Sequence, residues 1–348
     1  MQIYLNENLS AYHTFGIEQS CQVLVTVNTV AELIDVYRHP EWQLLPKIVL
    51  GKGSNVLFSE FYEGVVIINQ LRGIDVREDE SHYFLHVQGG EDWPELVRWS
   101  VSQQIPGLEN LAMIPGCAGS APIQNIGAYG LEFQDVCDYV DYLCLKTFQI
   151  IRLNRAECLF GYRDSIFKHQ LYQQAVVVGV GLKLAKAWQP RLKYGPLQQL
   201  ASHCSSAEVF DCICDIRTRK LPDPTVIGNA GSFFKNPVLT AAQFEALAAN
   251  YPEVVSYPAS SGMKVAAGWL IDQCGLKGFQ IGGAAIHEQQ ALVLINRQHA
   301  TASDVIQLAT HVYRCVYEKY GVALEHEVRF IGRSSEVYLD MWLKEQQL

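Results

Sequence analysis

The sequence KIVLGKGSNVLF occupies residues 47–58 and decides how the first part of the chain folds. Two short apolar runs, 47–50 and 56–58, are typical of strands, and the glycine-rich loop 51–55 separates them. The GxxxxGK[ST] spacing of a P-loop is absent, and a strand follows where a Rossmann turn needs a helix. We interpret the loop as backbone N–H groups curled around an anion; a hairpin turn with glycine at positive φ is the alternative.

Strand and helix patterns alternate outward from this loop. Capping boxes mark helix starts, as at Thr29 with Glu32, and Gly321 ends the longest helical pattern. Strand patterns are short apolar or alternating runs. We expect strands over 21–27, 65–69, 84–88, 138–146, 175–185, 291–295 and 327–331, and helices from Thr29 and over 91–104, 154–161, 240–249, 264–274 and 301–320.

Composition limits the classes of protein to which the chain can belong. Of its 348 residues, 49% are hydrophobic and 18% are charged, which suits two or three globular domains and excludes a disordered chain. The formal net charge of −9 argues against general nucleic-acid binding. The first residues lack a signal-peptide pattern, no apolar run is long enough to cross a bilayer, and the ten cysteines form no CxxC pair. We therefore expect a cytoplasmic protein with reduced thiols and no membrane partner.

Residues 115–130 form a second candidate site. Glycine and alanine are interleaved through this stretch, which weakens both helix and strand, so we expect a long loop. Its small residues would let the backbone lie flat against a planar ligand, while Gln124, Asn125 and Tyr129 add polar groups. A glycine-rich surface loop without a ligand is the alternative.

Two further motifs each carry one chemical group. Ser232 lies in GNAGSFFKNP, residues 228–237, where a hydroxyl held in a dry site can donate or relay a proton. Arg163 lies in GYRD, residues 161–164, and its guanidinium can hold a carboxylate by two hydrogen bonds. The structural alternatives are a Gly-Ser turn for the first motif and, for the second, an ion pair with Asp164 or another surface acid.

The motif EHEVR, residues 325–329, places its two glutamates and Arg329 on one face of an expected strand. A buried glutamate beside an arginine can act as an acid or orient another group, whereas on a solvated edge strand these residues would have no chemical role. His287 and His311 lack partners at metal-ligand spacing, so we expect no metal site.

Taken in order, these motifs resemble the UDP-N-acetylenolpyruvoylglucosamine reductase family, also called UDP-N-acetylmuramate dehydrogenases. The resemblance runs from about residue 10 to residue 332. Its motifs are TFG (14–16), LGKGSNVL (50–57), the stretch from IPG to QNIGAYG (114–130), GYRDS (161–165), GNAGSFFKNP (228–237) and EVR (327–329). Six motifs in one order are far more specific than any one of them alone.

The family resemblance implies an α+β fold. It consists of an FAD-binding part of the vanillyl-alcohol-oxidase type (PCMH-like), made of two α+β subdomains, and a C-terminal α+β substrate-binding domain. We place the subdomains at 1–62 and 63–220, the second completed by 326–348, and the substrate-binding domain at 221–325, where LPDP (221–224) marks a boundary.

The resemblance also implies a reaction. NADPH reduces FAD, and the reduced flavin reduces the enolpyruvyl group of UDP-N-acetylglucosamine enolpyruvate, giving UDP-N-acetylmuramate for peptidoglycan synthesis, cell-wall biogenesis and cell division. By motif match, Ser232 donates the proton to C2 after hydride attack at C3, and Arg163 and Glu327 stabilise the enolic carboxylate. A serine hydroxyl is a weak acid, and Lys220 and Asn236 are the neighbours expected to activate it.

Binding roles follow from the same match. The loop at Gly51 would hold the FAD pyrophosphate, and residues 115–129 would flank the flavin. Tyr194 matches a tyrosine on an extra loop found in one of the family's two types, type I, and residues 182–203 are long enough to host that loop. The implied FAD-binding residues are Thr14, Gly51, Lys52, Gly53, Ser54, Asn55, Pro115, Gly116, Gln124, Asn125 and Gly127. The implied substrate-binding residues are Tyr129, Tyr194, Lys220, Asn236 and Gln290.

Two other functions remain open at this point. The first is an FAD-dependent oxidase of the same fold, in which Cys117 is available as a flavin tether. The second is a non-catalytic protein that binds a flavin or a nucleotide sugar, although mere binding does not require a proton donor. We expect a monomer that binds small molecules, and we assign no function to the residues after Gly332.

Overall fold

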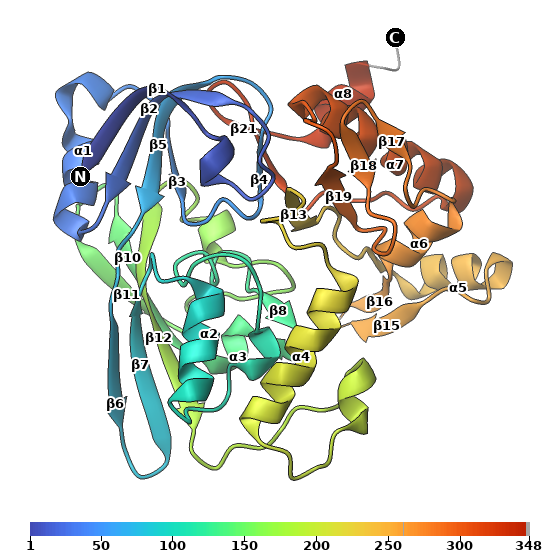
Figure 1. Ribbon diagram of the computed structural model, residues 1–348, viewed down its shortest axis with the longest axis horizontal. Helices are drawn as coiled ribbons and strands as arrows, with labels where there is room; N and C mark the ends of the chain where they lie inside the picture. Colours follow the sequence, from blue (N-terminus) through green and yellow to red (C-terminus); the bar gives the residue numbers. More distant parts are fainter. Residues whose placement is uncertain (260, 346–348) are drawn as a thin grey trace. The chain divides into compact units, whose positions relative to one another are not determined.

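The computed structural model describes residues 1–259 and 261–345 (Figure 1). The chain divides into two compact units. The first unit consists of Met1–Leu5, Val23–Lys52 and Val65–Arg219, and the second of Asn6–Gln22, Gly53–Gly64 and the chain from Lys220 onward. This grouping differs from the division predicted from the sequence, because the residues after 325 belong to the second unit.

Two main sheets lie largely in the first unit. The four-stranded sheet has the order β1–β2–β5–β3, with β1 at Gln2–Asn8, β2 at Ser20–Val27, β5 at Tyr62–Asn69 and β3 at Lys47–Leu50. Strands β3 and β5 pair in parallel, and helix α1 (Val30–Arg38) begins after its N-cap, Thr29. Valines of β2 and β5 share one core with the apolar face of α1.

The five-stranded sheet is antiparallel throughout, in the order β11–β10–β12–β7–β6. Its strands are β6 (Ile74–Glu78), β7 (His82–Gln88), β10 (Cys137–Cys144), β11 (Ile150–Asn154) and β12 (Ala175–Ala185). The central strand β12 is almost wholly apolar because both of its faces are buried. Val180 packs into the core beneath helices α2 (Trp93–Ser102), α3 (Phe133–Val136) and α4 (Ser206–Lys220), whereas Val178 packs into the core shared with the first sheet (Figure 1).

The second unit contains three small sheets. Their strands are β13 (Asn229–Ser232), β19 (Val293–Asn296), β18 (Ala284–Ile286) and β17 (Gln280–Ile281); β14 (Val238–Leu239), β16 (Gly262–Val265) and β15 (Ser256–Ala259); and β21 (Glu336–Val337), β20 (Arg329–Ile331) and β4 (Val56–Phe58). Its helices are α5 (Ala241–Asn250), α6 (Ala267–Gln273), α7 (Ala302–Tyr320) and α8 (Leu339–Glu345). Phe330 and Leu339 belong to the same buried cluster as Val312 of α7, so the end of the described chain is part of this unit's core.

Most expected elements are present, in the α+β arrangement that the resemblance implied. Strand β12 and the helices expected over 240–249 and 301–320 are confirmed, and each of these two helices begins with a capping box, at Thr240 and Thr301. The expected helix over 154–161 is wrong. Asn154 and Glu157 make the expected cap hydrogen bonds, but the chain continues only as turns, so a cap alone does not make a helix.

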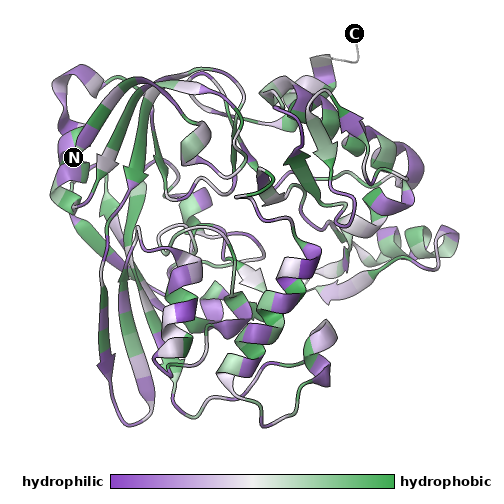
Figure 2. Ribbon diagram, in the orientation of Figure 1, coloured by the Kyte–Doolittle hydropathy of each residue, from purple (hydrophilic) through white to green (hydrophobic). Residues whose placement is uncertain are grey.

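The structure differs from the sequence-based expectations in two other ways: one helix starts later than expected, and several elements were not expected. The helix expected over 264–274 begins only at Ala267, because strand β16 takes the residues before it. Strands β1, β6 and β11 and helix α4 were not expected. Figure 2 shows apolar residues concentrated along the central strands of the sheets. Within residues 1–259 and 261–345, each helix is too short or too polar to cross a bilayer.

Candidate functional site

The glycine-rich loop 51–55 joins two strands that belong to different sheets. Strand β3 pairs with β5, whereas β4 pairs with β20, so the hairpin alternative is wrong. Gly53 has φ +58°, and a Cβ there would lie 2.4 Å from the carbonyl oxygen of Tyr12. Only glycine fits this position, which leaves the turn as bare backbone.

The first half of this loop packs on the second candidate loop. A Cβ on Gly51 would lie 2.7 Å from Sγ of Cys117, and Lys52 forms an ion pair of 3.0 Å with Asp92. Burial, aided by the charge of Asp92, raises the pKa of Cys117 to about 11. The thiol is therefore neutral near pH 7 and a poor nucleophile for tethering a flavin.

The loop from Pro115 to Gly130 is held by backbone hydrogen bonds to glycines and helix α2. Trp93 N donates to the Gly116 carbonyl (3.0 Å), and Gly119 N donates to the Gly89 carbonyl (2.8 Å). A Cβ on Gly119 would lie 2.8 Å from the same Gly89 oxygen. The small residues that the sequence singled out therefore permit close backbone packing within the protein.

Asn125 is fully buried, has φ +43°, and acts as a clamp, because its side chain hydrogen-bonds to three other segments of the chain. Its Nδ2 donates to Glu132 and to the Gly161 carbonyl, both at 2.9 Å, and its Oδ1 accepts from Gln134 N. The clamp ties the loop, and the short hairpin of β8 (Gly127–Ala128) and β9 (Leu131–Glu132), to the turn that carries Arg163. Since these amide atoms are engaged, what Asn125 can offer a cofactor is its backbone.

Arg163 lies in a turn closed by mutual hydrogen bonds of Gly161 and Asp164. Its backbone has φ +56°, and its Nη2 donates to the Gly127 carbonyl at 3.0 Å. Asp164 pairs with His169 at 2.8 Å. A non-glycine residue at positive φ is strained, and such strain is typical of functional positions.

Tyr129 and Tyr194 pack edge to face, with ring centroids 5.4 Å apart. Tyr129 is half-buried and has φ +49°, whereas Tyr194 is exposed. The structure therefore brings together, within the first unit, two of the residues expected to bind substrate. Sequence analysis missed Arg217 on α4, whose charge acts on the Tyr129 hydroxyl: burial raises the pKa of this phenol, and the guanidinium partly opposes that rise.

The loop that carries Tyr194 is fastened at its base. Trp188 Nε1 donates to Glu109 Oε1 (2.8 Å), Asn110 Nδ2 donates to the Arg191 carbonyl (3.1 Å), and Arg191 donates to the Gly130 carbonyl (3.1 Å). Glu109 and Asn110 are fully buried polar residues. The signal that could have revealed them is a charged residue and an amide within the apolar run 105–114.

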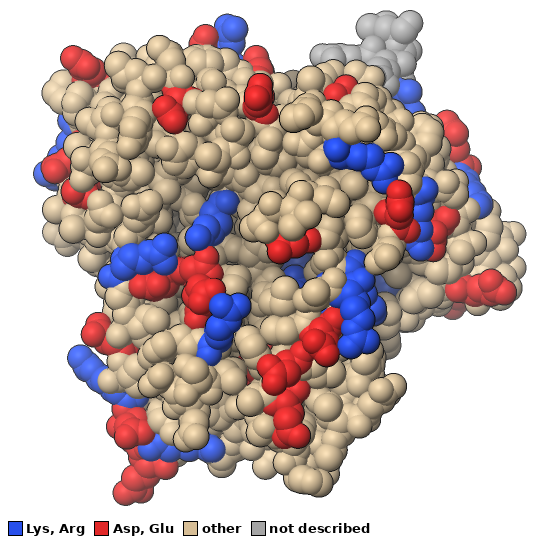
Figure 3. All heavy atoms as spheres, viewed as in Figure 1, with Lys and Arg blue, Asp and Glu red and all other residues tan. Residues whose placement is uncertain are grey.

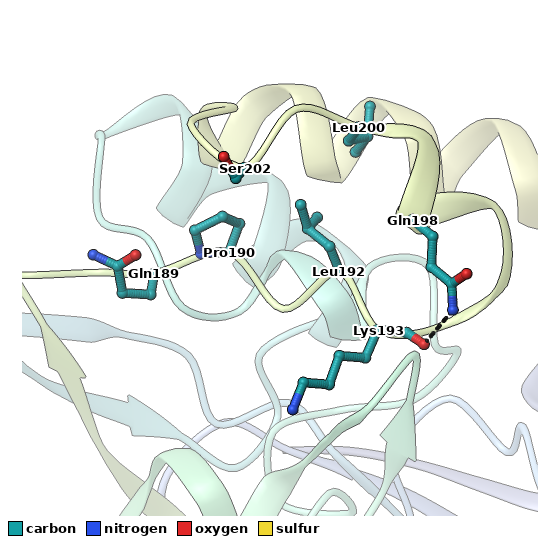
Figure 4. Close-up of a pocket in the computed structure, with 7 residues that line it drawn as sticks. All are labelled: Gln189, Pro190, Leu192, Lys193, Gln198, Leu200 and Ser202. Carbon is teal, nitrogen blue, oxygen red and sulfur yellow. Dashed lines mark hydrogen bonds between the residues drawn. The ribbon is translucent and has the colours of Figure 1, made fainter.

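The same loop is hollowed by a shallow groove of about 560 Å³ (Figure 4). Gln198 Nε2 donates to the Lys193 carbonyl at 2.9 Å and joins two sides of the groove. The lining residues are Gln189, Pro190, Leu192, Lys193, Gln198, Leu200 and Ser202. The groove thus lies next to Tyr194 and is lined mostly by polar and aliphatic groups.

In the second unit, Thr14 forms two hydrogen bonds with Asn229, the first residue of β13. Thr14 Oγ1 donates to the Asn229 carbonyl (2.7 Å), and Asn229 N donates to the Thr14 carbonyl (3.0 Å). A Cβ on Gly228 would lie 2.2 Å from the Phe15 carbonyl oxygen. Two motifs far apart in the sequence, TFG and GNAGSFF, therefore depend on each other's backbone.

Ser232 ends β13 directly after Gly231, which has φ +72°. The residue is exposed, while Phe233 and Phe234 after it are buried. Glu327 N donates to the Phe233 carbonyl at 2.8 Å. The turn thus presents the Ser232 hydroxyl at the surface of the unit. The backbone of Glu327 is hydrogen-bonded to the residue that follows Ser232.

Strand β20 is shorter than expected but central. It begins at Arg329 and lies between β21 and β4, so the alternative of a solvated edge strand is wrong. Asn55 Nδ2 donates to the Glu327 carbonyl (3.2 Å), and Arg329 N donates to the Asn55 carbonyl (3.1 Å). Arg329 also donates twice to Glu336. Asn55 therefore connects the glycine-rich loop 51–55 to the EVR motif, residues 327–329.

Two amides predicted to bind substrate have their oxygens engaged. Asn236 Oδ1 accepts from Ala267 N at 2.9 Å and thereby supports the start of α6. Gln290 Oε1 accepts from Leu292 N at 3.4 Å. Each amide is thus oriented so that its NH₂ group is the part available to a ligand oxygen. Lys220 is exposed at the end of α4.

The residues fit FAD better than a metal ion. Bare backbone at Gly53, with the Ser54 and Asn55 side chains beside it, matches the donors that a pyrophosphate requires. Across residues 1–259 and 261–345, His, Cys, Asp and Glu form no cluster that would hold a metal. On the face shown in Figure 3, acidic and basic side chains are interspersed.

Known proteins match along the whole chain. A family model described as the UDP-N-acetylenolpyruvoylglucosamine reductase C-terminal domain matches residues 223–331, and one described as an FAD binding domain matches residues 21–148. The UDP-N-acetylenolpyruvoylglucosamine reductase of Vibrio cholerae serotype O1 is 59% identical over 99% of this chain and 100% of its own length. That of Pasteurella multocida is 53% identical over 95% of this chain and 98% of its own length.

Solved structures agree with the sequence relatives. The UDP-N-acetylenolpyruvylglucosamine reductase from Thermus caldophilus is 26% identical, has a TM-score of 0.67, and matches over 95% of this chain and 98% of that chain. The 6-hydroxy-D-nicotine oxidase from Arthrobacter nicotinovorans matches over 92% of this chain and 86% of that chain, with a TM-score of 0.52. At 12% identity, this oxidase shares the fold alone.

Proposed function

The chain belongs to the UDP-N-acetylenolpyruvoylglucosamine reductase family, and from this premise we propose that it is an FAD-dependent oxidoreductase that reduces UDP-N-acetylglucosamine enolpyruvate. The electron donor is NADPH, and the product is UDP-N-acetylmuramate. The observation that carries the proposal is the 59% identity that extends over 99% of the chain. When bound, FAD supplies the hydride that reaches C3 of the enolpyruvyl group.

Arg163 and Glu327 stabilise the charge that develops on the enolic carboxylate. A carboxylate conjugated to a carbanion needs a fixed cation, because preorganised charge costs no reorganisation during the reaction. The bond from Arg163 to the Gly127 carbonyl and the strained turn hold its guanidinium in one place, which supports this role. Glu327 is half-buried, and the backbone bond to Phe233 orients it.

Ser232 donates the proton to C2. Its position after the left-handed Gly231 presents the hydroxyl beyond the buried phenylalanines, which supports its access to substrate. A serine hydroxyl is too weak an acid to act unaided near pH 7, so a cationic or amide neighbour must stabilise the alkoxide that forms. Lys220 and Asn236 are the residues we assign to this task.

The remaining polar groups bind the two phosphate-bearing ligands. Tyr194 closes on the diphosphate, as in type I members, and the NH₂ groups of Asn236 and Gln290 donate to ligand oxygens. Tyr129 lies against Tyr194 and belongs to the same binding surface. The FAD-binding set is the one given above, with the loop 51–55 around the pyrophosphate and residues 115–129 beside the flavin.

We also propose the predicted three-part division at 1–62, 63–220 and 221–325, except that the residues after 325, predicted to complete the second part, group with the third. The enzyme acts in the cytoplasm as a monomer, without nucleic-acid or membrane partners. All ten cysteines are free thiols, which supports a reducing compartment. The net charge of −9 supports the absence of a nucleic-acid partner.

Anaerobic stopped-flow absorbance of the flavin tests the proposal. The holoenzyme is reduced with NADPH and then mixed with UDP-N-acetylglucosamine enolpyruvate. Rapid reoxidation without oxygen is the expected result. If the flavin is reoxidised only by air, the chain is an oxidase, and the role of Ser232 loses its support. Release of yellow flavin on denaturation is expected, and a covalently retained flavin would favour the oxidase.

A further inference from the structure

The half-buried side chain of Lys168 donates a hydrogen bond from its Nζ to the backbone carbonyl of Arg163, at 2.8 Å. Both residues belong to the first unit. The mechanism proposed above gives Arg163 a task and gives Lys168 none. An ammonium that donates to an oxygen forms a charge-assisted hydrogen bond, which is stronger than a neutral one. This bond therefore restrains the backbone of a residue to which we assign a chemical role.

The backbone of Arg163 needs such a restraint. Its φ of +56° lies in the left-handed region, which residues with a Cβ avoid. Leu159 is also left-handed, with φ +48°, so the chain departs twice from its preferred conformations within this segment. A strained residue keeps its conformation only when the surrounding structure fixes it from several sides.

Lys168 is anchored independently of Arg163. It ends a 3-10 turn in which Phe167 is buried. Ser165, directly before this turn, is fully buried, and its Oγ donates to the Ile123 carbonyl at 2.7 Å. Lys168 N also donates to the Ser165 carbonyl at 3.0 Å. The ammonium therefore reaches back to Arg163 from a base that is already fixed.

The guanidinium end of Arg163 is held separately. Its Nη2 donates to the Gly127 carbonyl at 3.0 Å. A Cβ on Gly127 would lie 3.4 Å from Nη1 of Arg163 and 2.9 Å from Cγ of Glu132, so glycine leaves room for the guanidinium here. Arg163 is thus tied at its side chain and, through Lys168, at its carbonyl. Loss of the second tie lets the backbone relax toward the right-handed region, and the guanidinium moves with it.

We propose that Lys168 is a positioning residue that holds Arg163 in its left-handed conformation and thereby keeps the guanidinium in place to stabilise the enolic carboxylate of the UDP-sugar. This role rests on the function proposed above, in which Arg163 meets charge that develops during the reaction. A fixed cation is effective there because it needs no reorganisation as the charge develops. Lys168 does not touch the substrate in this role, so its effect passes through Arg163.

This role predicts which kinetic constant changes. An interaction made only as charge develops affects the rate of the chemical step, whereas a contact with the bound substrate affects its KM. Lys168→Met keeps the aliphatic part of the side chain and removes the donor. It should slow the reoxidation of reduced flavin by saturating UDP-sugar, and it should leave the KM and the reduction of the flavin by NADPH close to wild type.

The experiment compares five holoenzymes: wild type, K168M, K168R, R163M and the R163M/K168M double variant. Lys319→Met is the matched control, because the Lys319 ammonium also donates to a backbone carbonyl, that of Gln273, in the second unit. Stopped-flow absorbance resolves the two flavin half-reactions. Melting curves give stability, and bound flavin per chain confirms that each variant is loaded. K168Q replaces K168M if the latter retains no flavin.

A second measurement follows the turn directly. Gly161 N donates to the Asp164 carbonyl at 3.0 Å, and Asp164 N donates to the Gly161 carbonyl at 3.3 Å, so both amides are protected while the turn is closed. Hydrogen–deuterium exchange of the oxidised holoenzyme, read by peptide mass spectrometry, should become about tenfold faster for these amides in K168M. In K319M it should not change. This measurement needs neither substrate nor turnover.

The expected rates follow from the loss of one charge-assisted hydrogen bond. K168M slows the reoxidation of the flavin by about ten- to hundredfold. K168R keeps donors that can reach a carbonyl and lies closer to wild type. The double variant is no slower than R163M, because Lys168 has no effect once the guanidinium is gone. K319M matches wild type in both half-reactions.

Four results would overturn the proposal: unchanged exchange of the turn in K168M, an unchanged rate of reoxidation, a raised KM with the rate at saturation intact, or further slowing when K168M is added to R163M. Equal slowing of both half-reactions with a lower melting temperature also overturns it, since the lysine would then be merely structural. If wild type is not reoxidised by the UDP-sugar, the proposed function fails instead, and Lys168 is judged on the exchange of the turn alone.

Discussion

The indole N–H of Trp188 donates a hydrogen bond of 2.8 Å to the carboxylate of Glu109. Glu109 begins a buried 3-10 turn, and the next residue, Asn110, donates to the carbonyls of Tyr129 and Arg191. Trp188 stands at the base of the loop that carries Tyr194. One buried turn thus holds both the Tyr129 backbone and the Tyr194 loop, so their mutual position depends on it.

Trp188→Phe should loosen the Tyr194 loop. The change removes the indole donor and leaves the buried carboxylate short of one hydrogen bond, a loss of about 1.5–3 kcal/mol. We expect faster proteolytic cleavage within residues 186–204 and a severalfold higher KM for the UDP-sugar, with unchanged flavin content. Limited proteolysis followed by mass spectrometry locates the cut. Equal cleavage rates in the variant and wild type would show that this bond does not restrain the loop.

Glu109→Gln should change how stability depends on pH. Burial raises the pKa of Glu109 above 4.5, so its carboxyl binds a proton more tightly in the folded state. The contribution of this group to stability is therefore greatest in acid and decreases as the pH rises through the folded-state pKa. Glutamine does not titrate. The melting temperature of wild type minus that of E109Q should decrease from about pH 4 to about pH 7, and an increase would contradict the shift.

Asn236 has two separable tasks. Its Oδ1 accepts from Ala267 N, and we assign its NH₂ group to the ligand. Asn236→Asp keeps an acceptor for the helix but replaces the donor with a negative charge, so stability should hold while the KM rises at least tenfold. Asn236→Ala, the matched control, should also lose about 1 kcal/mol of stability. If N236D binds the UDP-sugar as wild type does, the amide is only a helix cap.

Gly53→Ala should abolish flavin retention. The new Cβ would meet the Tyr12 carbonyl oxygen at 2.4 Å in a backbone with φ +58°, so the loop must move. Gly16→Ala is a matched control, because Gly16 has φ +62° and nothing within 4 Å of its Cβ. The control should cost about 1 kcal/mol and retain FAD. Absorbance of purified protein measures bound flavin, and equal flavin content in the two variants would remove the loop from the cofactor site.

The parts of the chain that could be predicted are those whose structure depends on neighbouring residues in the sequence. Features that depend on residues far along the chain could not be predicted. Strand β12 was found to the residue because burial of both faces makes it a continuous apolar run. The loop 51–55 was found because glycine marks it. Helix α4 was missed although Val209, Ile213 and Ile216 recur at helical spacing, since polar residues and cysteines dilute the pattern. Arg217 could not be found, because whether a helical arginine faces solvent or a tyrosine is decided by residues far along the chain.

Ser232→Ala separates binding from chemistry. The change removes the hydroxyl at the end of β13 and leaves Gly231 and the buried Phe233 in place, so flavin content and melting temperature should match wild type. Reduction of the flavin by NADPH needs no proton from Ser232 and should proceed at the normal rate. Reoxidation by the UDP-sugar should slow by about 10²–10⁴-fold, the range typical of a lost general acid. Stopped-flow absorbance resolves the two half-reactions in one preparation, so the first serves as the control for the second. If both slow equally, the serine affects the flavin or its environment rather than proton transfer. If neither slows, another group protonates C2, and the left-handed turn at Gly231 presents a hydroxyl that the reaction does not use.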